Sequence, residues 1–163
     1  MQKIKTILYA TDLSESAKPA LSWAMSLAEK YDASISIIHI IPDMIEELSA
    51  SMGYDLLAHY KVEQLADLNK DGQNDAKDAI KDRIKSVCDQ MNDDFPSCRM
   101  DFHHIIIKAG HPVKSIIDTA KDGGFDIVVM GTHGHGILDN LLLGSVARGV
   151  VQKCPIPVLT IRI

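Results

Sequence analysis

The chain has 163 residues, of which 46% are hydrophobic, 24% charged and 5% aromatic, a balance typical of one globular domain with its own core. Seventeen Lys and Arg against 22 Asp and Glu give a formal net charge of −5, so no basic surplus indicates a nucleic-acid partner. The three cysteines form no CxxC pair, and no apolar run reaches the ~18 residues of a membrane span. We therefore expect a cytoplasmic protein that does not bind a membrane.

The first part of the chain predicts a strand, a helix and a second strand. An apolar run at 4–9 precedes a polar loop, and small apolar residues then recur at helical spacing, with Pro19 in the first turn, where a missing N–H is tolerated. The β-branched run 33–41 predicts a strand covered on both faces. Residues 43–75 carry weaker helical signals interrupted by Gly and Ser, and we expect a mobile helical excursion there.

The rest of the chain continues to alternate helices and strands. We predict helices at 76–91, from Gly110-His111-Pro112 to Gly123-Gly124, and from about Ser145, and strands at 99–108, 126–130 and 158–163. Such alternation indicates a parallel sheet with right-handed crossovers. The sequence therefore predicts a single α/β domain over residues 1–163.

A glycine-rich loop follows the strand predicted at 126–130, at the end of the sheet where open parallel sheets bind ligands. Glycines at 131, 134 and 136 permit positive φ and a close approach to a ligand. Gly144-Ser145 begins a helix whose first N–H groups and dipole suit a phosphate. No Walker lysine precedes Ser145 and no GxGxxG opens the helix, so these glycines alone are equally consistent with turn geometry.

The spacing Gly131-x2-Gly134-x9-Gly144-Ser145 resembles the nucleotide signature of the universal stress protein family. The likeness extends to residues 7–14, 38–40, 110–112 and 155–159, and so covers nearly the whole chain apart from about 43–75. It implies an open, mainly parallel, Rossmann-like sheet of five strands in the order 3-2-1-4-5, with helices on both faces. One departure is Ala10, where close ATP-binding relatives often have proline.

The resemblance to the ATP-binding branch of this family also implies a nucleotide site. Asp12 would lie beside the ribose and the adenine, and Ile40 would contact the adenine. The implied contact residues are Ala10, Thr11, Asp12, Ile40, Met130, Gly131, Thr132, His133, Gly134, Gly144, Ser145 and Val146. The implied ligand is ATP, ADP or AMP, with Mg²⁺.

Some of these residues have other interpretations. His133 and His135 could offer two imidazoles to one metal ion, but no third ligand has a helpful spacing, and we expect no metal site. Asp12 lies where receiver domains carry a phosphoacceptor, although Thr11 stands before it in place of a second acidic residue. Asp12 could instead stabilise the dipole of the following helix. We expect His39 to be a hydrogen-bonded strand residue.

Two functions of different classes remain open. We expect a nucleotide-responsive stress-response module that acts through its shape or a partner surface. Fast phosphoryl transfer needs cations and an oriented nucleophile at the phosphates, and we expect Arg148, one turn after Ser145, to face solvent. The alternative is a slow adenine-nucleotide hydrolase. The intact glycine set argues against a mere dimerisation module with a vestigial site.

The run 158–163 predicts how the protein assembles. It is a strong β-former, and the family resemblance implies that it lies at one edge of the sheet. Pairing with its copy about a two-fold axis would satisfy both edges, so we expect a homodimer. A short edge protected by Arg162 is the alternative. The sequence names no downstream protein partner.

Overall fold

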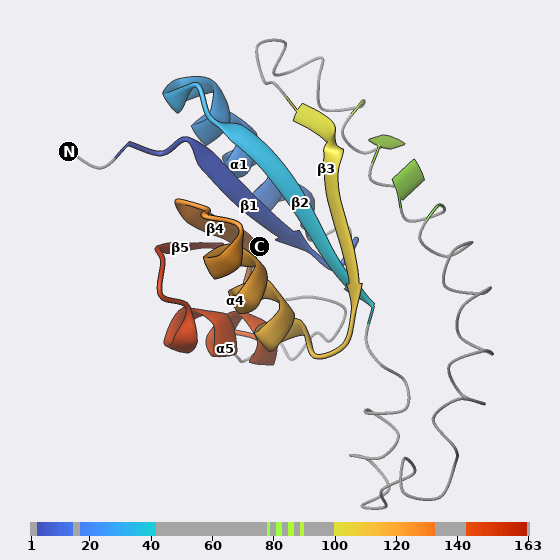
Figure 1. Ribbon diagram of the computed structural model, residues 1–163, viewed down its shortest axis with the longest axis vertical. Helices are drawn as coiled ribbons and strands as arrows, with labels where there is room; N and C mark the ends of the chain where they lie inside the picture. Colours follow the sequence, from blue (N-terminus) through green and yellow to red (C-terminus); the bar gives the residue numbers. More distant parts are fainter. Residues whose placement is uncertain are drawn as a thin grey trace, which may run out of the picture.

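The computed structural model describes residues 3–14, 17–41, 78, 81–82, 85–86, 89, 100–132 and 143–162. The strands are β1 Thr6–Thr11, β2 Ser34–Ile41, β3 Met100–Ala109, β4 Ile127–Gly131 and β5 Val158–Ile161. They form one sheet in the order β3-β2-β1-β4-β5 (Figure 1), and its four pairings are all parallel. The predicted order and parallel sense are confirmed, whereas the excursion expected at 43–75 lies outside the described residues.

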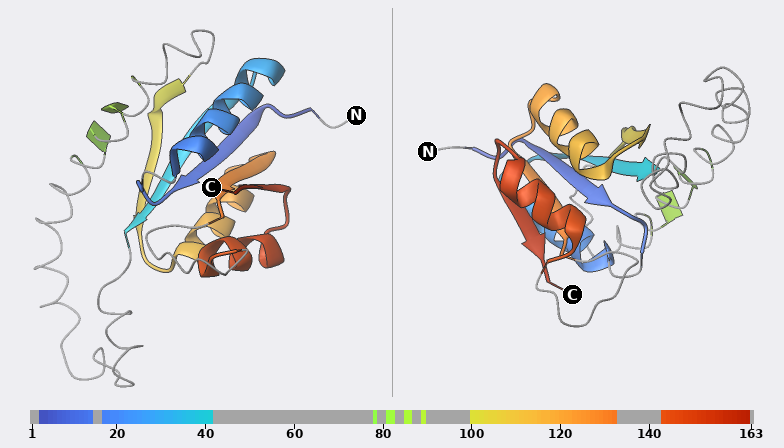
Figure 2. Two further views of the ribbon diagram at one scale, coloured as in Figure 1. Left: turned by 180° about the vertical axis from the view of Figure 1, so that it is seen from behind. Right: turned by 90° about the horizontal axis from the view of Figure 1, so that it is seen from below.

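The described helices cover both faces of this sheet, as expected, and are α1 Lys18–Tyr31, α4 Pro112–Asp122 and α5 Ser145–Lys153. On one face α1 packs its buried side chains, including Leu21 and Met25, against Ile7 and Tyr9 of β1. On the other face α4 and α5 cover Leu8 and Ala10 of β1 and Val128 of β4. Figure 2 shows the two layers from further directions. This division is the one that right-handed crossovers produce when the strand order reverses at β1.

The described helix borders agree closely with the pattern in the sequence. Pro19 lies in the first turn of α1, and α5 begins at Ser145. Gly110 precedes α4 with a φ of +127°, in the left-handed region that suits glycine. In the helix predicted at 76–91, the described positions 78, 81–82, 85–86 and 89 are helical and exposed. No helix among the described residues is long and apolar enough to cross a membrane.

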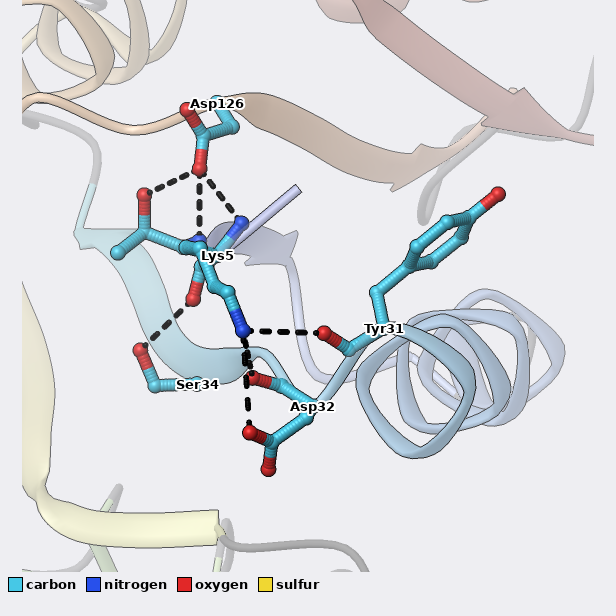
Figure 3. Close-up of polar contacts among 6 residues, drawn as sticks. Lys5, Tyr31, Asp32, Ser34 and Asp126 are labelled. Atoms are coloured by element: carbon cyan, nitrogen blue, oxygen red, sulfur yellow. Dashed lines mark hydrogen bonds and ion pairs between the residues drawn. The ribbon is translucent and has the colours of Figure 1, made fainter. Parts of the chain in front are cut away.

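The start of β1 differs from the prediction, and a carboxylate binds the backbone there. The apolar run begins at Ile4, but the strand begins at Thr6. The Oδ2 atom of Asp126 accepts the Lys5 amide at 2.7 Å, the Thr6 amide at 2.9 Å and the Thr6 hydroxyl at 3.2 Å (Figure 3). The backbone amide of Lys5, and to a smaller extent that of Thr6, holds the pKa of Asp126 below its usual value, because these bonds favour the charged form.

The Lys5 side chain completes a junction at this amino end of the sheet. Its Nζ donates to the carbonyls of Tyr31 and Asp32, at 3.4 and 3.3 Å, where α1 ends. The Asp32 carboxylate lies 3.7 Å from the same Nζ. The starts of β1 and β4 and the end of α1 are thereby joined. This junction lies at the amino end of the sheet, and the predicted site lies at the carboxyl end.

Close packing fixes where α5 lies on α4. A Cβ atom at Gly149 of α5 would lie 2.8 Å from a methyl group of Val113 in α4. Glycine at this position lets the two helices approach closely, although it costs helix stability. The middle of α5 thus lies directly against α4.

Candidate functional site

The candidate site lies where the strand order of the sheet reverses. From β1 the chain crosses to β2 on one side, and from β4 it crosses to β5 on the other. The neighbouring strands β1 and β4 end at Thr11 and Gly131, so the loops that leave them diverge. A crevice for ligands is expected at such a switch point in open α/β sheets.

The loop after β1 is organised by its own side chains. Asp12 Oδ1 accepts the Ser14 amide at 3.0 Å and the Ser14 hydroxyl at 2.6 Å. Thr11 Oγ1 accepts the Leu13 amide at 3.0 Å, and Leu13 has a φ of +64°, which is unusual for a side chain of this size. The half-buried Asp12 carboxylate is therefore held at the end of β1 by local bonds.

His39 links this loop to the end of β2, a connection that sequence reasoning did not find. Its Nδ1 lies 2.9 Å from the carbonyl oxygen of Thr11, and because a carbonyl only accepts, Nδ1 carries the proton. The expectation of a hydrogen-bonded strand histidine is confirmed. This bond holds the backbone directly before Asp12, so His39 helps to position the Asp12 loop.

The predicted base-side residues fall into two groups. Ala10, Ile40 and Met130 are buried in one apolar cluster on the face covered by α4 and α5, and Val146 packs against that cluster. Ala10 and Met130 are paired in register across β1 and β4. Thr11 follows Ala10 at the carboxyl end of β1, where its hydroxyl shapes the loop. The site thus has an apolar wall on one side of the sheet and polar groups at the strand ends.

The amino end of α5 is attached directly to the end of β4. The Thr132 amide donates to the Ile161 carbonyl at 2.9 Å, and the Gly144 amide donates to the Thr132 carbonyl at 2.8 Å. The first helical bond of α5 runs from Arg148 N–H to Gly144 O, at 2.9 Å. The amides of residues 145–147 therefore precede the helical ladder, and no side chain among the described residues caps this end.

Arg148 is exposed, as expected, but it is turned toward the helix start. Its Nη2 donates to the Leu143 carbonyl at 3.2 Å. Leu143 directly precedes Gly144, the N-cap of α5. The guanidinium of this exposed residue thus lies beside the start of α5, the helix at which the sequence predicts a phosphate site.

The structure also corrects two details of the sequence analysis. Among the described glycines, positive φ occurs at Gly110 and Gly124, so Gly131 and Gly144 do not need glycine for their backbone angles. Gly144 has a φ of −63° and a ψ of 163°, which other residues also adopt. The proposed role of Asp12 at the dipole of α1 is wrong, because the N-cap is Ala17 and the first turn has no acidic residue.

Some predicted positions lie outside the described residues, namely His133, Gly134, His135 and Gly136. Of the described predicted contact residues, Thr132 is buried and Ser145 is exposed at the first position of α5. Within the described ranges no three His, Cys, Asp or Glu side chains gather as a metal site would require. The structure therefore places Asp12 directly after β1, and the amino end of α5 beside the end of the neighbouring strand β4, at the carboxyl end of the sheet.

Comparison with known proteins gives a consistent assignment. The family model described as "Universal stress protein family" matches residues 3–162. Universal stress protein MJ0577 of Methanocaldococcus jannaschii is 30% identical over 97% of this chain and 94% of its own. Universal stress protein Sll1388 of Synechocystis is 28% identical over 96% of each chain.

Solved structures agree with the fold. The structure of MJ0577 matches with a TM-score of 0.73 and 26% identity, over 99% of this chain and 98% of that one. A universal stress protein solved in complex with cAMP matches with a TM-score of 0.57 and 19% identity, over 99% and 98% of the two chains. The match of the family model over nearly the whole sequence, and the similarity to MJ0577 along both chains, lead to one conclusion: the chain belongs to the universal stress protein family.

Proposed function

We propose that this protein binds ATP or a related adenine nucleotide and acts as a nucleotide-responsive regulatory module in the stress response. The observation that carries the proposal is the junction of β4 and α5. There, the Gly144–Thr132 bond of 2.8 Å holds the amides of residues 145–147, which precede the first helical hydrogen bond of α5, at the switch point of the sheet. Free amides at the positive end of a helix dipole form a binding site for phosphate.

The remaining residues support a nucleoside beside that phosphate site. Ile40 and Met130 lie near the carboxyl ends of β2 and β4 in an apolar cluster, the kind of environment that a purine base prefers. The Asp12 carboxylate is an acceptor for ribose hydroxyls or an exocyclic amine. Ala10 belongs to the same buried wall. His133 and Gly134 complete the proposed contacts on the basis of the family signature.

A binding module explains these groups better than an efficient enzyme does. The described groups supply amides, one hydroxyl at Ser145 and the Arg148 guanidinium, without a described base oriented by a third group. Mg²⁺ is proposed to accompany the phosphates of the nucleotide. A slow hydrolase of the same fold stays the alternative. The cysteine pattern in the sequence supports a cytoplasmic location for either activity.

The decisive experiment combines binding and turnover. Titration calorimetry with ATP, ADP and AMP on the wild-type protein is expected to show saturable binding. Mass spectrometry of material released from freshly purified, denatured protein would identify a co-purified nucleotide. Steady-state hydrolysis is expected far below the ~1–10³ s⁻¹ of typical enzymes. Absence of binding by any of the three nucleotides would refute the proposal, and turnover above about 1 s⁻¹ would favour the hydrolase.

We further propose a homodimer formed through β5, which is the edge strand of the sheet. The Pro157 carbonyl accepts a bond from Val128 of β4 at 3.0 Å, and the Ile161 carbonyl accepts one from Thr132, directly after β4, at 2.9 Å. By the alternation of a parallel ladder, the backbone groups of Val158 and Thr160 then face away from β4. These outward groups can pair with a second copy about a two-fold axis.

The dimer predicts a specific effect of proline at Thr160. Thr160→Pro removes an outward N–H and leaves the bonds to β4, whereas a change at Ile161 would disturb the core under α1. Light scattering is expected to give twice the 17.9 kDa chain mass for the wild type and the single chain mass for Thr160→Pro. The control Thr160→Val keeps the N–H and should stay dimeric. A monomeric wild type would disprove this assembly.

A further inference from the structure

Arg148 lies where a helix does not favour a positive charge. It is the fourth residue of α5, and the first turn of that helix contains no acidic residue to balance it. The amino end of a helix is the positive end of its dipole, so a cation there is unfavourable for the helix itself. A position that breaks a local rule without an evident gain for the fold is a candidate for function.

The geometry of α5 directs this charge to the phosphate site. Helical residues three and four apart share a face, so Arg148 lies above Gly144 and Ser145. The Cα–Cβ bonds of a helix tilt toward its amino end. The bond of 3.2 Å from Arg148 Nη2 to the Leu143 carbonyl confirms that the guanidinium reaches back to the residue before the N-cap.

We propose that Arg148 distinguishes nucleotides by the number of their phosphate charges, so that the site prefers ATP to ADP and ADP to AMP. This inference rests on the proposed function. A guanidinium has five N–H donors in a planar fork that matches phosphate oxygens. The bond to the Leu143 carbonyl uses one donor, on Nη2, and the others can bind phosphate. The amides of residues 145–147 provide dipoles for the phosphate at the helix start. Arg148 adds a full positive charge, which attracts the additional phosphates of ADP and ATP.

The test compares nucleotides of different charge on matched variants. ATP, ADP, AMP and cAMP are titrated calorimetrically into the wild type, Arg148→Gln, Arg148→Lys and Lys153→Gln. Arg148→Gln keeps a polar side chain but loses the charge. Lys153→Gln makes the same change of net charge at the other end of α5, where Lys153 is exposed.

Arg148→Gln is expected to weaken ATP binding about tenfold, as for the loss of one charge-assisted hydrogen bond, and to leave AMP binding nearly unchanged. The ATP-to-AMP affinity ratio should be largely kept in Arg148→Lys and fully kept in Lys153→Gln. High salt should reduce this ratio in the wild type more than in Arg148→Gln, because screening weakens the contribution of the charge.

The outcomes separate this inference from the proposed function. If Arg148→Gln lowers ATP and AMP affinity by the same factor, or changes neither, Arg148 does not read phosphate charge and the inference is overturned. If the wild type binds none of the four nucleotides, the proposed function fails and the role of Arg148 fails with it. Thermal unfolding of each variant, measured without nucleotide, shows whether a uniform loss reflects damage to α5.

Discussion

Gly144→Val is expected to lower the affinity for ATP by at least about 100-fold, or roughly 2.7 kcal/mol. Gly144 joins the end of β4 to α5 through its 2.8 Å bond to Thr132 and directly precedes the amides of the proposed phosphate site. Its φ of −63° and ψ of 163° are allowed for valine, so the backbone need not change. Two new methyl groups would then occupy the space of the phosphate, and calorimetry with ATP measures the loss.

Two further variants make this result specific. Gln152→Val places the same β-branched side chain on an exposed position of α5, away from its amino end, and should bind ATP like the wild type. Gly144→Ala should lose less affinity than Gly144→Val, because its side chain is smaller. ATP binding of wild-type strength by a folded Gly144→Val, as judged by circular dichroism, would mean that phosphate does not bind at this helix.

Asp126→Ala is expected to lower the free energy of unfolding at neutral pH by about 0.5–1.5 kcal/mol, because the solvent-accessible amides of Lys5 and Thr6 exchange a charged acceptor for water. The same carboxylate makes stability depend on pH. Its pKa is lower in the folded protein, so its stabilisation is present above the unfolded pKa of about 3.9 and is lost as the pH falls below it. Urea unfolding between neutral pH and pH 3 or so measures both effects.

The control for this prediction is an exposed carboxylate elsewhere in the chain. Asp118 is exposed on α4, and Asp118→Asn should change neither the stability at neutral pH nor its decline in acid. Asp126→Asn keeps the shape but removes the charge, so its stability should decline less steeply than that of the wild type on acidification. An identical acid profile for Asp126→Asn and the wild type would exclude this carboxylate as a source of the pH dependence.

Local patterns in the sequence were sufficient for the elements and for the class of fold. The β-branched run of β2 and the helical spacing around Leu21 in α1 report burial directly, because a strand or helix must hide its apolar side chains. The family resemblance added the strand order, which periodicity alone does not contain. The positions of Asp12 and Ser145 at strand and helix ends likewise followed from the sequence.

Other features depend on residues that are distant in the sequence and were decided by the tertiary structure. β1 begins at Thr6 rather than at Ile4, and its first amide donates to Asp126, 120 residues further on. The partner of His39 is a carbonyl on the neighbouring strand, 28 residues away. Arg148 looks like a solvent-facing residue in the sequence, and only the coordinates reveal its bond to Leu143. Apolar periodicity encodes which side of an element is buried, whereas a single polar bond depends on the distance and direction between two atoms, which exist only once the chain has folded.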